Sequence, residues 1–232
     1  RTVVAYSERL PSHLEMYGFW LYDPQANIVT NGRPDLANES ALSATLGASY
    51  RIDDLTIQAS GFVRGVDGYI APDPASTIVQ PGQPPIRTMN NIGVAFFTGI
   101  DCSVSYPVYD HMSLQGSVRA VWGKGVTVND ALPLINPLTA SIRTVVGDPT
   151  LQGELVLTGA IAQNRVSTWI LPEDTTPGWF RMDLLGAWRP TSFLRLQASC
   201  TNVFNTFYHE HTSINNLAAR GRSFNVGVRV EL

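Results

Sequence analysis

Side chains that could bind a metal gather in one short stretch near the end of the chain, Tyr208-His209-Glu210-His211. Imidazole and carboxylate groups are good ligands for metals and for metal chelates. In an extended chain His209 and His211 lie on one face about 6–7 Å apart, and no third ligand is evident. Two interpretations stay open, namely contact with a metal or metal chelate and packing of a loop. We predict no resident metal and no cofactor.

The other two histidines give no sign of catalysis. His13 falls in an expected loop and His111 in an expected turn, and neither has an acid nearby at the spacing that enzymes use. Serine, histidine and carboxylate residues are scattered, without the spacing of a Ser-His-Asp or paired-carboxylate site. The sequence therefore predicts no catalytic residues and no enzyme.

The segment from Met16 to Tyr22, MYGFWLY, is the other stretch that could bind a ligand. It is apolar and aromatic, and it lies in a long expected loop, where binding residues concentrate on rigid scaffolds. Two interpretations stay open here as well: contact with a hydrophobic or aromatic ligand, and a small core within the loop.

The element that must position these loops is a strand, best seen in the last stretch of the chain, GRSFNVGVRVEL. Side chains of a strand alternate between its faces. One face carries Phe224, Val226, Val228, Val230 and Leu232, which are mostly β-branched or aromatic. The other face is polar and includes Arg229 and Glu231. We expect the apolar face to meet lipid and the polar face to meet a lumen.

The same alternation recurs in about ten segments, and the connections between them alternate strictly between long and short. Short turns are expected at 51–54, 106–111, 147–150 and 189–192. One rim of the sheet would therefore carry only short turns, and the other rim would carry every long loop. The Pro- and Gly-rich loop at 66–91 is expected to hold no packed element.

Segregation of loop length by rim is typical of outer-membrane barrels, which have short periplasmic turns and long extracellular loops. Strands of about ten residues fit a tilted bilayer span, and aromatic residues fall near strand ends. The sequence predicts an all-β, antiparallel transmembrane β-barrel with meandering strands. A soluble β-sandwich binding module explains the alternation equally well, but it does not explain the rims.

Composition excludes other classes. Charged residues are only 15% and the net charge is −3, which gives no electrostatic case for binding nucleic acid. The sequence contains no run of about eighteen apolar residues, which is the pattern that predicts a transmembrane helix. Cys102 and Cys200 lie on the apolar register of separate strands, so we expect them to be unpaired.

Several stretches resemble TonB-dependent outer-membrane receptors. SERLPSHLEMYGF is similar to that family's Arg-x-Pro-Ser-x-x-Glu segment, and NGRPDLANES to its Gly-Asn-Pro-x-Leu-x-x-Glu motif, with Arg33 in place of the usual Asn. The ending is similar to the family's Asn-x-Phe-x-x-x-Tyr and Gly-Arg-x-Phe pattern, although Leu232 replaces the usual terminal aromatic residue. Further similar stretches are residues 132–142, 162–167 and 173–188.

The resemblance covers only the C-terminal part of such a receptor and implies that residues 1–232 are the last ten of about twenty-two barrel strands, without the N-terminal plug. It implies TonB-energised uptake of a scarce metal chelate across the outer membrane: siderophore-iron, haem, cobalamin or copper. The expected partners are outer-membrane lipid, the chelate, the missing plug and strands, and the TonB complex acting through that plug.

The alternative is a self-contained small outer-membrane barrel with a passive pore, adhesive or structural role. The residues that we expect to contact a ligand from the extracellular loops are Tyr17, Trp20, Arg33, Tyr208, His209 and His211.

Overall fold

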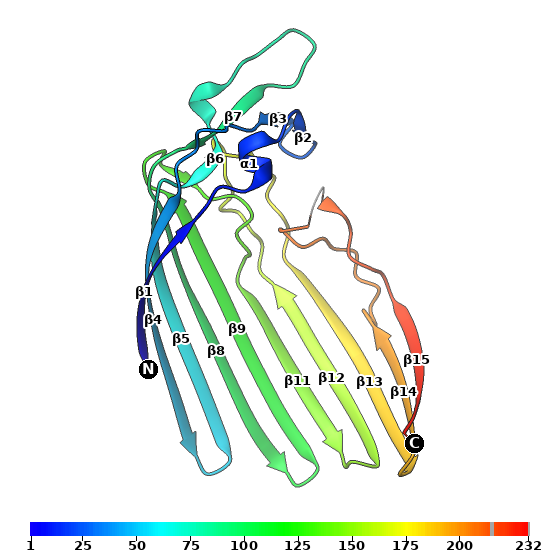
Figure 1. Cartoon of the computed structure of the whole chain (residues 1–232). Coiled ribbons are helices and arrows are strands. Elements are labelled where there is room, and N and C mark those ends of the chain that lie inside the picture. Colours follow the sequence, from blue (N-terminus) through cyan, green and yellow to red (C-terminus); the bar gives the residue numbers. More distant parts are fainter. Residues whose placement is uncertain (214–215, 232) are drawn as a thin grey trace.

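The computed structural model describes residues 1–213 and 216–231. A single curved antiparallel sheet dominates the molecule (Figure 1), in the order β1-β4-β5-β8-β9-β11-β12-β13-β14-β15, with the short β10 paired to β9. The strands of this path are β1 (Thr2–Arg9), β4 (Glu39–Ile52), β5 (Leu55–Asp67), β8 (Ala95–Tyr109), β9 (Met112–Gly125), β11 (Thr139–Gly147), β12 (Leu151–Ala160), β13 (Trp179–Thr191), β14 (Leu194–Thr201) and β15 (Ser223–Val230), and β10 is Asp130–Ala131. The all-β antiparallel prediction is confirmed.

The connections alternate in length as expected. Short turns join β4 to β5, β8 to β9, β11 to β12 and β13 to β14, and all of them lie at the lower end in Figure 1, which we call the short-turn end. In one of them Gly147 has a φ of 117°, a left-handed conformation that favours glycine. The side chain of Asp148 then accepts hydrogen bonds from the backbone of Thr150 at 2.7 Å and Leu151 at 3.0 Å.

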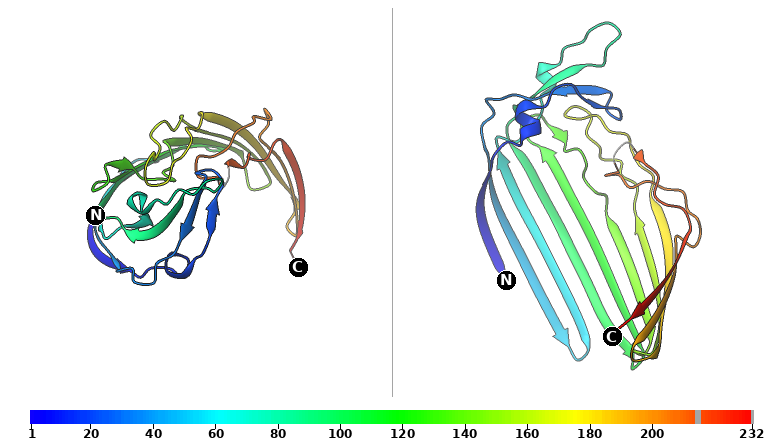
Figure 2. Two further views of the ribbon diagram at one scale, coloured as in Figure 1. Left: turned by 90° about the horizontal axis from the view of Figure 1, so that it is seen from above. Right: turned by 45° about the vertical axis from the view of Figure 1, so that its right-hand side comes forward.

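Long connections gather at the opposite end, which we call the loop end. Here a second, four-stranded sheet has the order β2-β3-β7-β6, and seen from above it lies within the arc of the main sheet (Figure 2). Its elements are β2 (Leu21–Asp23), β3 (Ile28–Asn31), β6 (Ile70–Pro72) and β7 (Ile86–Asn91), accompanied by the helix α1 (His13–Tyr17) and the 3-10 turn η1 (Pro74–Ser76).

The expectation that residues 66–91 hold no packed element is wrong. β6 pairs antiparallel with β7, and β7 pairs parallel with β3 from a different loop. Three of the five prolines and one of the two glycines in residues 66–91 lie at 81–85, so they shape the tip of this loop. The flanking Ile70–Pro72 and Ile86–Asn91 pair on either side of it. Partners distant in sequence supply the hydrogen bonds that local composition did not suggest.

Buried apolar side chains gather only beneath the loops, in a cluster of Ala41, Val66, Ala71, Ala95, Leu132, Ile135 and Ile170. Along the strands themselves the apolar face of the main sheet is open. Val226 is 83% exposed and Phe224 is 74% exposed, and Leu42, Leu46, Ile100 and Trp188 on other strands are also exposed. No second layer of protein covers this face within the described residues.

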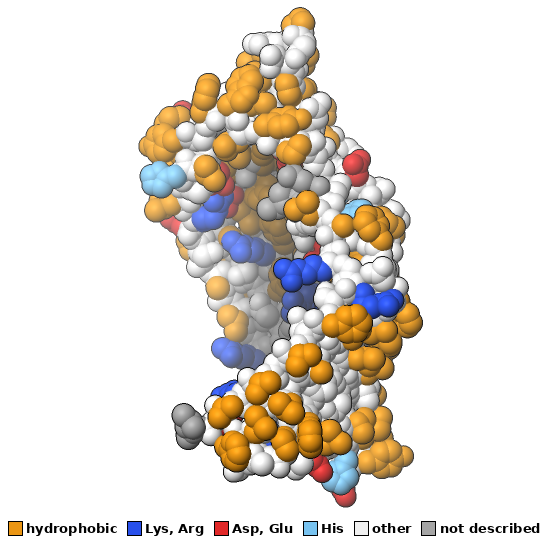
Figure 3. Space-filling view, turned by 90° about the vertical axis from the view of Figure 1, so that its right-hand side faces the viewer, with side chains coloured by type: hydrophobic (Ala, Val, Ile, Leu, Met, Phe, Trp, Pro, Cys, Tyr) orange, Lys and Arg blue, Asp and Glu red, His pale blue; other side chains and the backbone are white. Residues whose placement is uncertain are grey.

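The other face of the main sheet is hollowed and polar. Figure 3 looks at the molecule from its open side, where arginine side chains line the hollow while apolar side chains dominate the rest of the surface. Arg143 on this face lies 2.8 Å from Glu154, and Arg119 lies 2.8 Å from Asp101. Opposite faces of one sheet therefore have opposite chemistry, as the sequence alternation predicts.

Cys102 and Cys200 are free, as predicted. Leu232, which we predicted to face lipid, lies outside the described residues. Among the helices in the described part of the chain, none has both the length and the apolar character that a membrane crossing requires.

The first two receptor-like stretches form one cluster of ion pairs and hydrogen bonds at the loop end. Arg9 contacts Glu39 at 2.7 Å and Glu15 at 2.8 Å. Glu15 also closes a capping box with Ser12 at the start of α1, and Glu39 accepts a hydrogen bond from the backbone of Ile70 at 2.7 Å. The motif residues thus tie β1, α1, β4 and β6 together.

Gly32 belongs to the same cluster, and its lack of a side chain lets its backbone approach the backbone of Met16 and Gly18 closely. A Cβ atom there would lie 2.7 Å from the Met16 carbonyl carbon and 2.8 Å from the Gly18 nitrogen. We expect Gly32→Ala to destabilise the loop end by about 1–3 kcal/mol, because backbone atoms must shift. Chymotrypsin digestion of the folded protein measures this as faster cleavage in the first long loop, which contains Tyr17, Phe19, Trp20 and Tyr22.

Gly65→Ala is the matched control, since a Cβ atom at Gly65 meets nothing within 4 Å. Equal cleavage rates for Gly32→Ala, Gly65→Ala and the unaltered protein would show that the close approach at Gly32 is not needed.

Candidate functional site

A polar hollow near the loop end lies on the concave face of the main sheet, over β8, β9, β11, β12 and β13. Its volume is about 530 Å³. The polar and aromatic residues that line it are Asp101, Ser117, Arg119, Asn136, Thr139, Ser141, Thr158, Trp179, Arg181, Glu210 and His211. We call this hollow the lumenal cavity.

β13 contributes Trp179 and Arg181 to the cavity, and alternation puts Asp183 on the same face. Arg181 Nη1 donates a hydrogen bond to the Tyr208 hydroxyl at 3.1 Å. The rings of Trp179 and Tyr208 stack with centroids 4.3 Å apart, a favourable arrangement for aromatic pairs. The last long loop, residues 202–222, is thereby pressed against the sheet.

Asn202 organises that loop from its first residue. It is buried with a φ of 52°, which asparagine tolerates well. Its amide nitrogen donates to the carbonyls of Thr206 at 2.9 Å and Arg220 at 3.1 Å, and its amide oxygen accepts from the Thr206 backbone at 2.9 Å. Asp183 in turn accepts from the Asn202 backbone at 2.8 Å. Both ends of the loop are therefore fastened to β13.

His211 joins this loop to the preceding one. Its Nδ1 lies 3.3 Å from the hydroxyl of Thr176, and its Nε2 lies 3.7 Å from a carboxylate oxygen of Glu173. The side chains of His211 and Glu173 are 1% and 3% exposed, and Nε2 has no hydrogen-bond partner. Glu173 also accepts from the Leu134 backbone at 2.7 Å. These contacts join the loop at 202–222 to the loop at 161–178.

Asp130 fastens the loop at 161–178 to β10. Its carboxylate accepts hydrogen bonds from the hydroxyl of Ser167 at 2.7 Å, from the backbone of Trp169 at 2.8 Å and from the backbone of Ile170 at 2.9 Å. Thr168 donates through both its backbone and its hydroxyl. Burial by itself would raise the pKa of Asp130, but these hydrogen bonds outweigh it and lower the pKa to about 2.

Arg87 connects a third loop, residues 68–94, to the backbone of Trp169 and Ile170. This buried arginine of β7 donates from Nη1 to the carbonyls of Trp169 and Ile170, both at 2.7 Å, and from Nε to Thr77 at 3.1 Å. Burial lowers the pKa of Arg87. The loops at 68–94, 126–138 and 161–178 thus share one hydrogen-bonded junction above the lumenal cavity.

The predicted ligand contacts do not lie together. Tyr208 and His211 are 5% and 2% exposed, and of the two only His211 lines the lumenal cavity. Tyr17 and Trp20 are exposed beside the second sheet. Arg33 pairs with Asp35 at 2.7 Å and donates to Asn90 at 2.9 Å. His209 is partly exposed and does not line the cavity.

Sequence reasoning missed the residues that build the junction and the cavity: Arg87, Asp130, Glu173, Arg181 and Asn202. Two of the receptor-like stretches contain Glu173, Arg181 and Asn202, so the family resemblance is the sequence signal that marks these three residues. Arg87 and Asp130 carry no local signal, because their partners are far away in the sequence.

The cavity combines hydrogen-bond donors, two arginine-centred ion pairs and an aromatic face, which suits reversible binding of a ligand with polar and aromatic parts. Within residues 1–213 and 216–231, no group of three or more His, Cys, Asp or Glu side chains is placed to hold a metal ion. Nor do the cavity residues place a nucleophile beside a base, as acyl or phosphoryl transfer requires.

Residues 1–203 match the family described as TonB dependent receptor-like, beta-barrel. The chain belongs to this family. Solved structures agree with the fold: the copper transporter OprC superimposes with a TM-score of 0.84 at 22% sequence identity, over 99% of this chain and 37% of OprC. No curated protein sequence matches the chain.

Two further solved structures have similar folds. A ferric enterobactin receptor mutant from Pseudomonas aeruginosa (PfeA) gives a TM-score of 0.77 at 15% identity, over 99% of this chain and 38% of that chain. The FrpB iron transporter from Neisseria meningitidis gives 0.67 at 17% identity, over 87% and 33%. The chain thus spans only 33–38% of the length of these structures, and at such identities the likeness shows the fold.

Replacing Asp130 with asparagine tests the junction. A neutral amide accepts the same hydrogen bonds more weakly and presents an NH₂ group to donors, so Asp130→Asn should destabilise the loop junction by about 2–3 kcal/mol. Pepsin digestion at acidic pH measures this as faster cleavage within residues 161–178.

The pH dependence follows from the lowered pKa. The carboxyl titrates near its ordinary value of 3.8 when unfolded and near 2 when folded, so its stabilising contribution is complete above about pH 4 and is lost as the pH falls through 2. Asp148→Asn is the control, since Asp148 accepts backbone hydrogen bonds in a short turn far from the loops. Cleavage of the Asp130→Asn variant that matches this control at every pH would contradict the assignment.

Proposed function

We propose that this chain forms the C-terminal part of the barrel of an outer-membrane receptor that takes up a scarce metal chelate. The chelate would be siderophore-iron, haem, cobalamin or copper, and the energy would come from the TonB complex acting on an N-terminal plug. The observation that carries the proposal is the family match over residues 1–203, and it is supported by a lumenal cavity under fastened loops. The named substrates of OprC, PfeA and FrpB, which are copper, ferric enterobactin and iron, fall in this class.

The open edges of the main sheet favour this proposal over a self-contained small barrel. β1 and β15 stand at opposite ends of the strand path and do not pair with each other. In a bilayer, unpaired backbone groups cost several kcal/mol each, about the value for any polar group in hydrocarbon. Further strands between β1 and β15 would remove both edges. We propose that the main-sheet strands of this chain are the last ten of about twenty-two in the complete barrel.

The exposed apolar face supports the same location. A contiguous apolar surface this large is unusual on a soluble protein. We propose that Phe224, Val226, Val228 and Val230 face lipid, with the loop end outside the cell and the short-turn end in the periplasm. Lipid would then supply the apolar environment that no protein layer provides.

Among the candidate ligand contacts, accessibility separates two roles. We propose that Tyr17, Trp20, Arg33 and His209 are placed for contact with a ligand that enters from the loop end. Tyr208 and His211 are too buried for first contact and instead hold the loop at 202–222. Arg181 and Trp179 are then the cavity residues that a ligand reaches next.

Growth of a deletion strain tests the function. We expect loss of the full gene to abolish growth on one of four defined sources, ferric siderophore, haem, cobalamin or copper, and the gene to restore it only when TonB is present. An Arg181→Gln receptor should lose about tenfold in uptake affinity, the effect of one charge-assisted hydrogen bond. Arg143→Gln, on the same face but near the short-turn end, is the matched control.

Unchanged growth on all four sources, or uptake that continues without TonB, would refute the proposal. Equal losses in the Arg181→Gln and Arg143→Gln receptors would show that the lumenal cavity is not the site of binding.

A further inference from the structure

Glu210 is an exposed carboxylate that lines the lumenal cavity. It lies in the last long loop between two buried residues, Tyr208 and His211. Ion pairs in this region join Arg181 to Asp183 and His211 to Glu173, and among the described residues none includes Glu210. The negative charge of Glu210 is therefore available to a ligand in the cavity.

The backbone that carries Glu210 is held firmly on both sides. The ring of Tyr208 stacks on Trp179 with centroids 4.3 Å apart, and His211 is only 2% exposed. The carbonyl of Glu210 itself accepts a hydrogen bond from the backbone of Ser213 at 2.9 Å. A charged group on a fixed backbone loses little conformational freedom when it binds a partner, so this carboxylate is preorganised.

The charges of the cavity do not balance once Glu210 is included. Arg119 pairs with Asp101 at 2.8 Å, and Nε of Arg181 lies 3.2 Å from a carboxylate oxygen of Asp183. Each cavity arginine thus has its own carboxylate, and Glu210 adds one negative charge when the imidazole groups are neutral. A site with excess negative charge favours a positively charged ligand and disfavours an anionic one.

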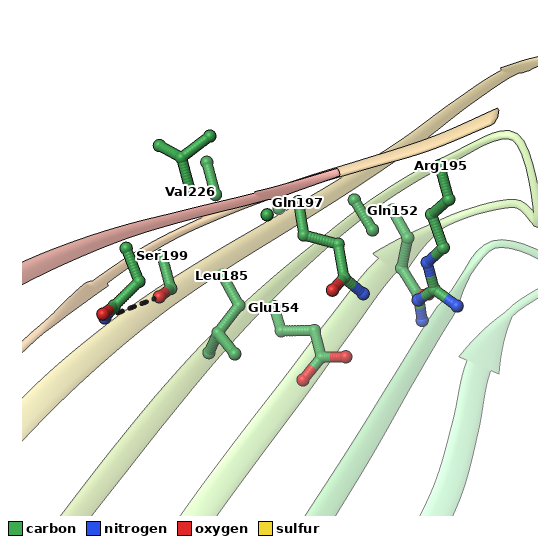
Figure 4. A pocket seen from close by; sticks show the side chains of 12 residues that line it. Gln152, Glu154, Leu185, Arg195, Gln197, Ser199 and Val226 are labelled. Atoms are coloured by element: carbon green, nitrogen blue, oxygen red, sulfur yellow. Dashed lines mark hydrogen bonds between the residues drawn. The ribbon is translucent and has the colours of Figure 1, made fainter. Parts of the chain in front are cut away.

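A second hollow on the same concave face provides a contrast. It has a volume of about 290 Å³ and lies nearer the short-turn end, and Figure 4 shows Glu154 and Arg195 among the side chains that line it. Glu154 is paired with Arg143 at 2.8 Å. Its charge is therefore neutralised within the barrel wall, as the charge of Asp101 is, whereas the charge of Glu210 is not.

The surroundings of Glu210 suit a protonated amine. A carboxylate accepts a charge-assisted hydrogen bond from an ammonium group, whereas a metal ion is usually held by three or more protein ligands. Trp179 lines the same cavity, and the face of an aromatic ring attracts cations. One carboxylate beside an aromatic residue therefore matches an organic ammonium group.

We propose that Glu210 is a specificity-determining residue of the lumenal cavity and selects a metal chelate that carries a protonated amine over an anionic chelate. This inference rests on the proposed function, which supplies the chelate and its route into the cavity. The ammonium group of the chelate donates to Glu210. Arg119 and Arg181, whose charges are already balanced, contribute hydrogen bonds to oxygen atoms of the chelate rather than net positive charge.

Binding of two matched probes to the purified full-length receptor tests this selectivity. The first is a ferric trihydroxamate with a free terminal amine, and the second is the same chelate with that amine acetylated, which removes the charge at nearly constant size. We expect the unaltered receptor to bind the amine form about tenfold more tightly, the effect of one charge-assisted hydrogen bond. The Glu210→Gln receptor should bind both forms equally, as measured by isothermal titration calorimetry.

Asp174→Asn is the matched control. Asp174 is an exposed carboxylate in the preceding long loop and does not line the cavity, so its replacement removes the same charge from the same end of the barrel. This variant should keep the preference for the amine form. Equal binding of both forms by the unaltered receptor, an equal loss in the control, or binding only of an anionic ferric tricatecholate or haem would each overturn the proposal. Binding of no amine-bearing probe would overturn it as well.

Chemical labelling of carboxylates gives a second readout in the full-length receptor. A carbodiimide with glycine ethyl ester should label Glu210 and Asp174 but not Glu173, whose side chain is 3% exposed. The amine-bearing chelate should protect Glu210 and leave the labelling of Asp174 unchanged. If Glu210 is not labelled without ligand, another part of the receptor covers it and the proposal is wrong.

The outcomes also separate this proposal from the proposed function. TonB-dependent uptake with the same preference in the unaltered and Glu210→Gln receptors would refute only the role of Glu210. A preference that depends on Glu210, in a receptor whose uptake does not need TonB, would refute only the energised transport.

Discussion

The antiparallel backbone ladder of the main sheet is the interaction on which the rest of the structure depends. Because side chains alternate along each strand, one ladder produces an apolar face and a polar face at once. No protein layer covers the apolar face along the strands, and buried apolar side chains gather only beneath the loops. The sheet therefore needs its surroundings to complete it, which links the fold directly to the proposed place in a membrane and to a polar lumen.

The loops add a second kind of order, built from charged groups with many hydrogen bonds. Asp130 and Arg87 meet at the backbone of Trp169 and Ile170, so three loops share one junction. A buried charge is tolerated only when it is well hydrogen-bonded, and here the donors and carbonyls come from segments far apart in sequence. We infer that the loop end is a rigid rim, able to hold the lumenal cavity open to a ligand.

Strand positions and faces could be predicted from the sequence because they follow from local alternation, as in Phe224 to Val230. The short turns were equally local, with Asp148 and Gly147 carrying the signal. The second sheet was missed because β3 and β7 pair across different loops, which no local pattern reports. The candidate site was predicted only in part: Tyr208 and His211 stood out as possible ligands, but their burial depends on Trp179, Thr176 and Glu173, whose positions tertiary structure alone decides.

The measurement that most directly tests the two-faced sheet is spin-label accessibility along β15, in the full-length receptor in lipid bilayers with Cys102 and Cys200 replaced by serine. A nitroxide at Val228 should be accessible to oxygen dissolved in lipid and shielded from a water-soluble nickel complex. A nitroxide at Asn225, on the polar face, should show the reverse preference. Equal accessibility of both positions to the nickel complex, or a reversed pattern, would contradict the account of a barrel wall between lipid and lumen.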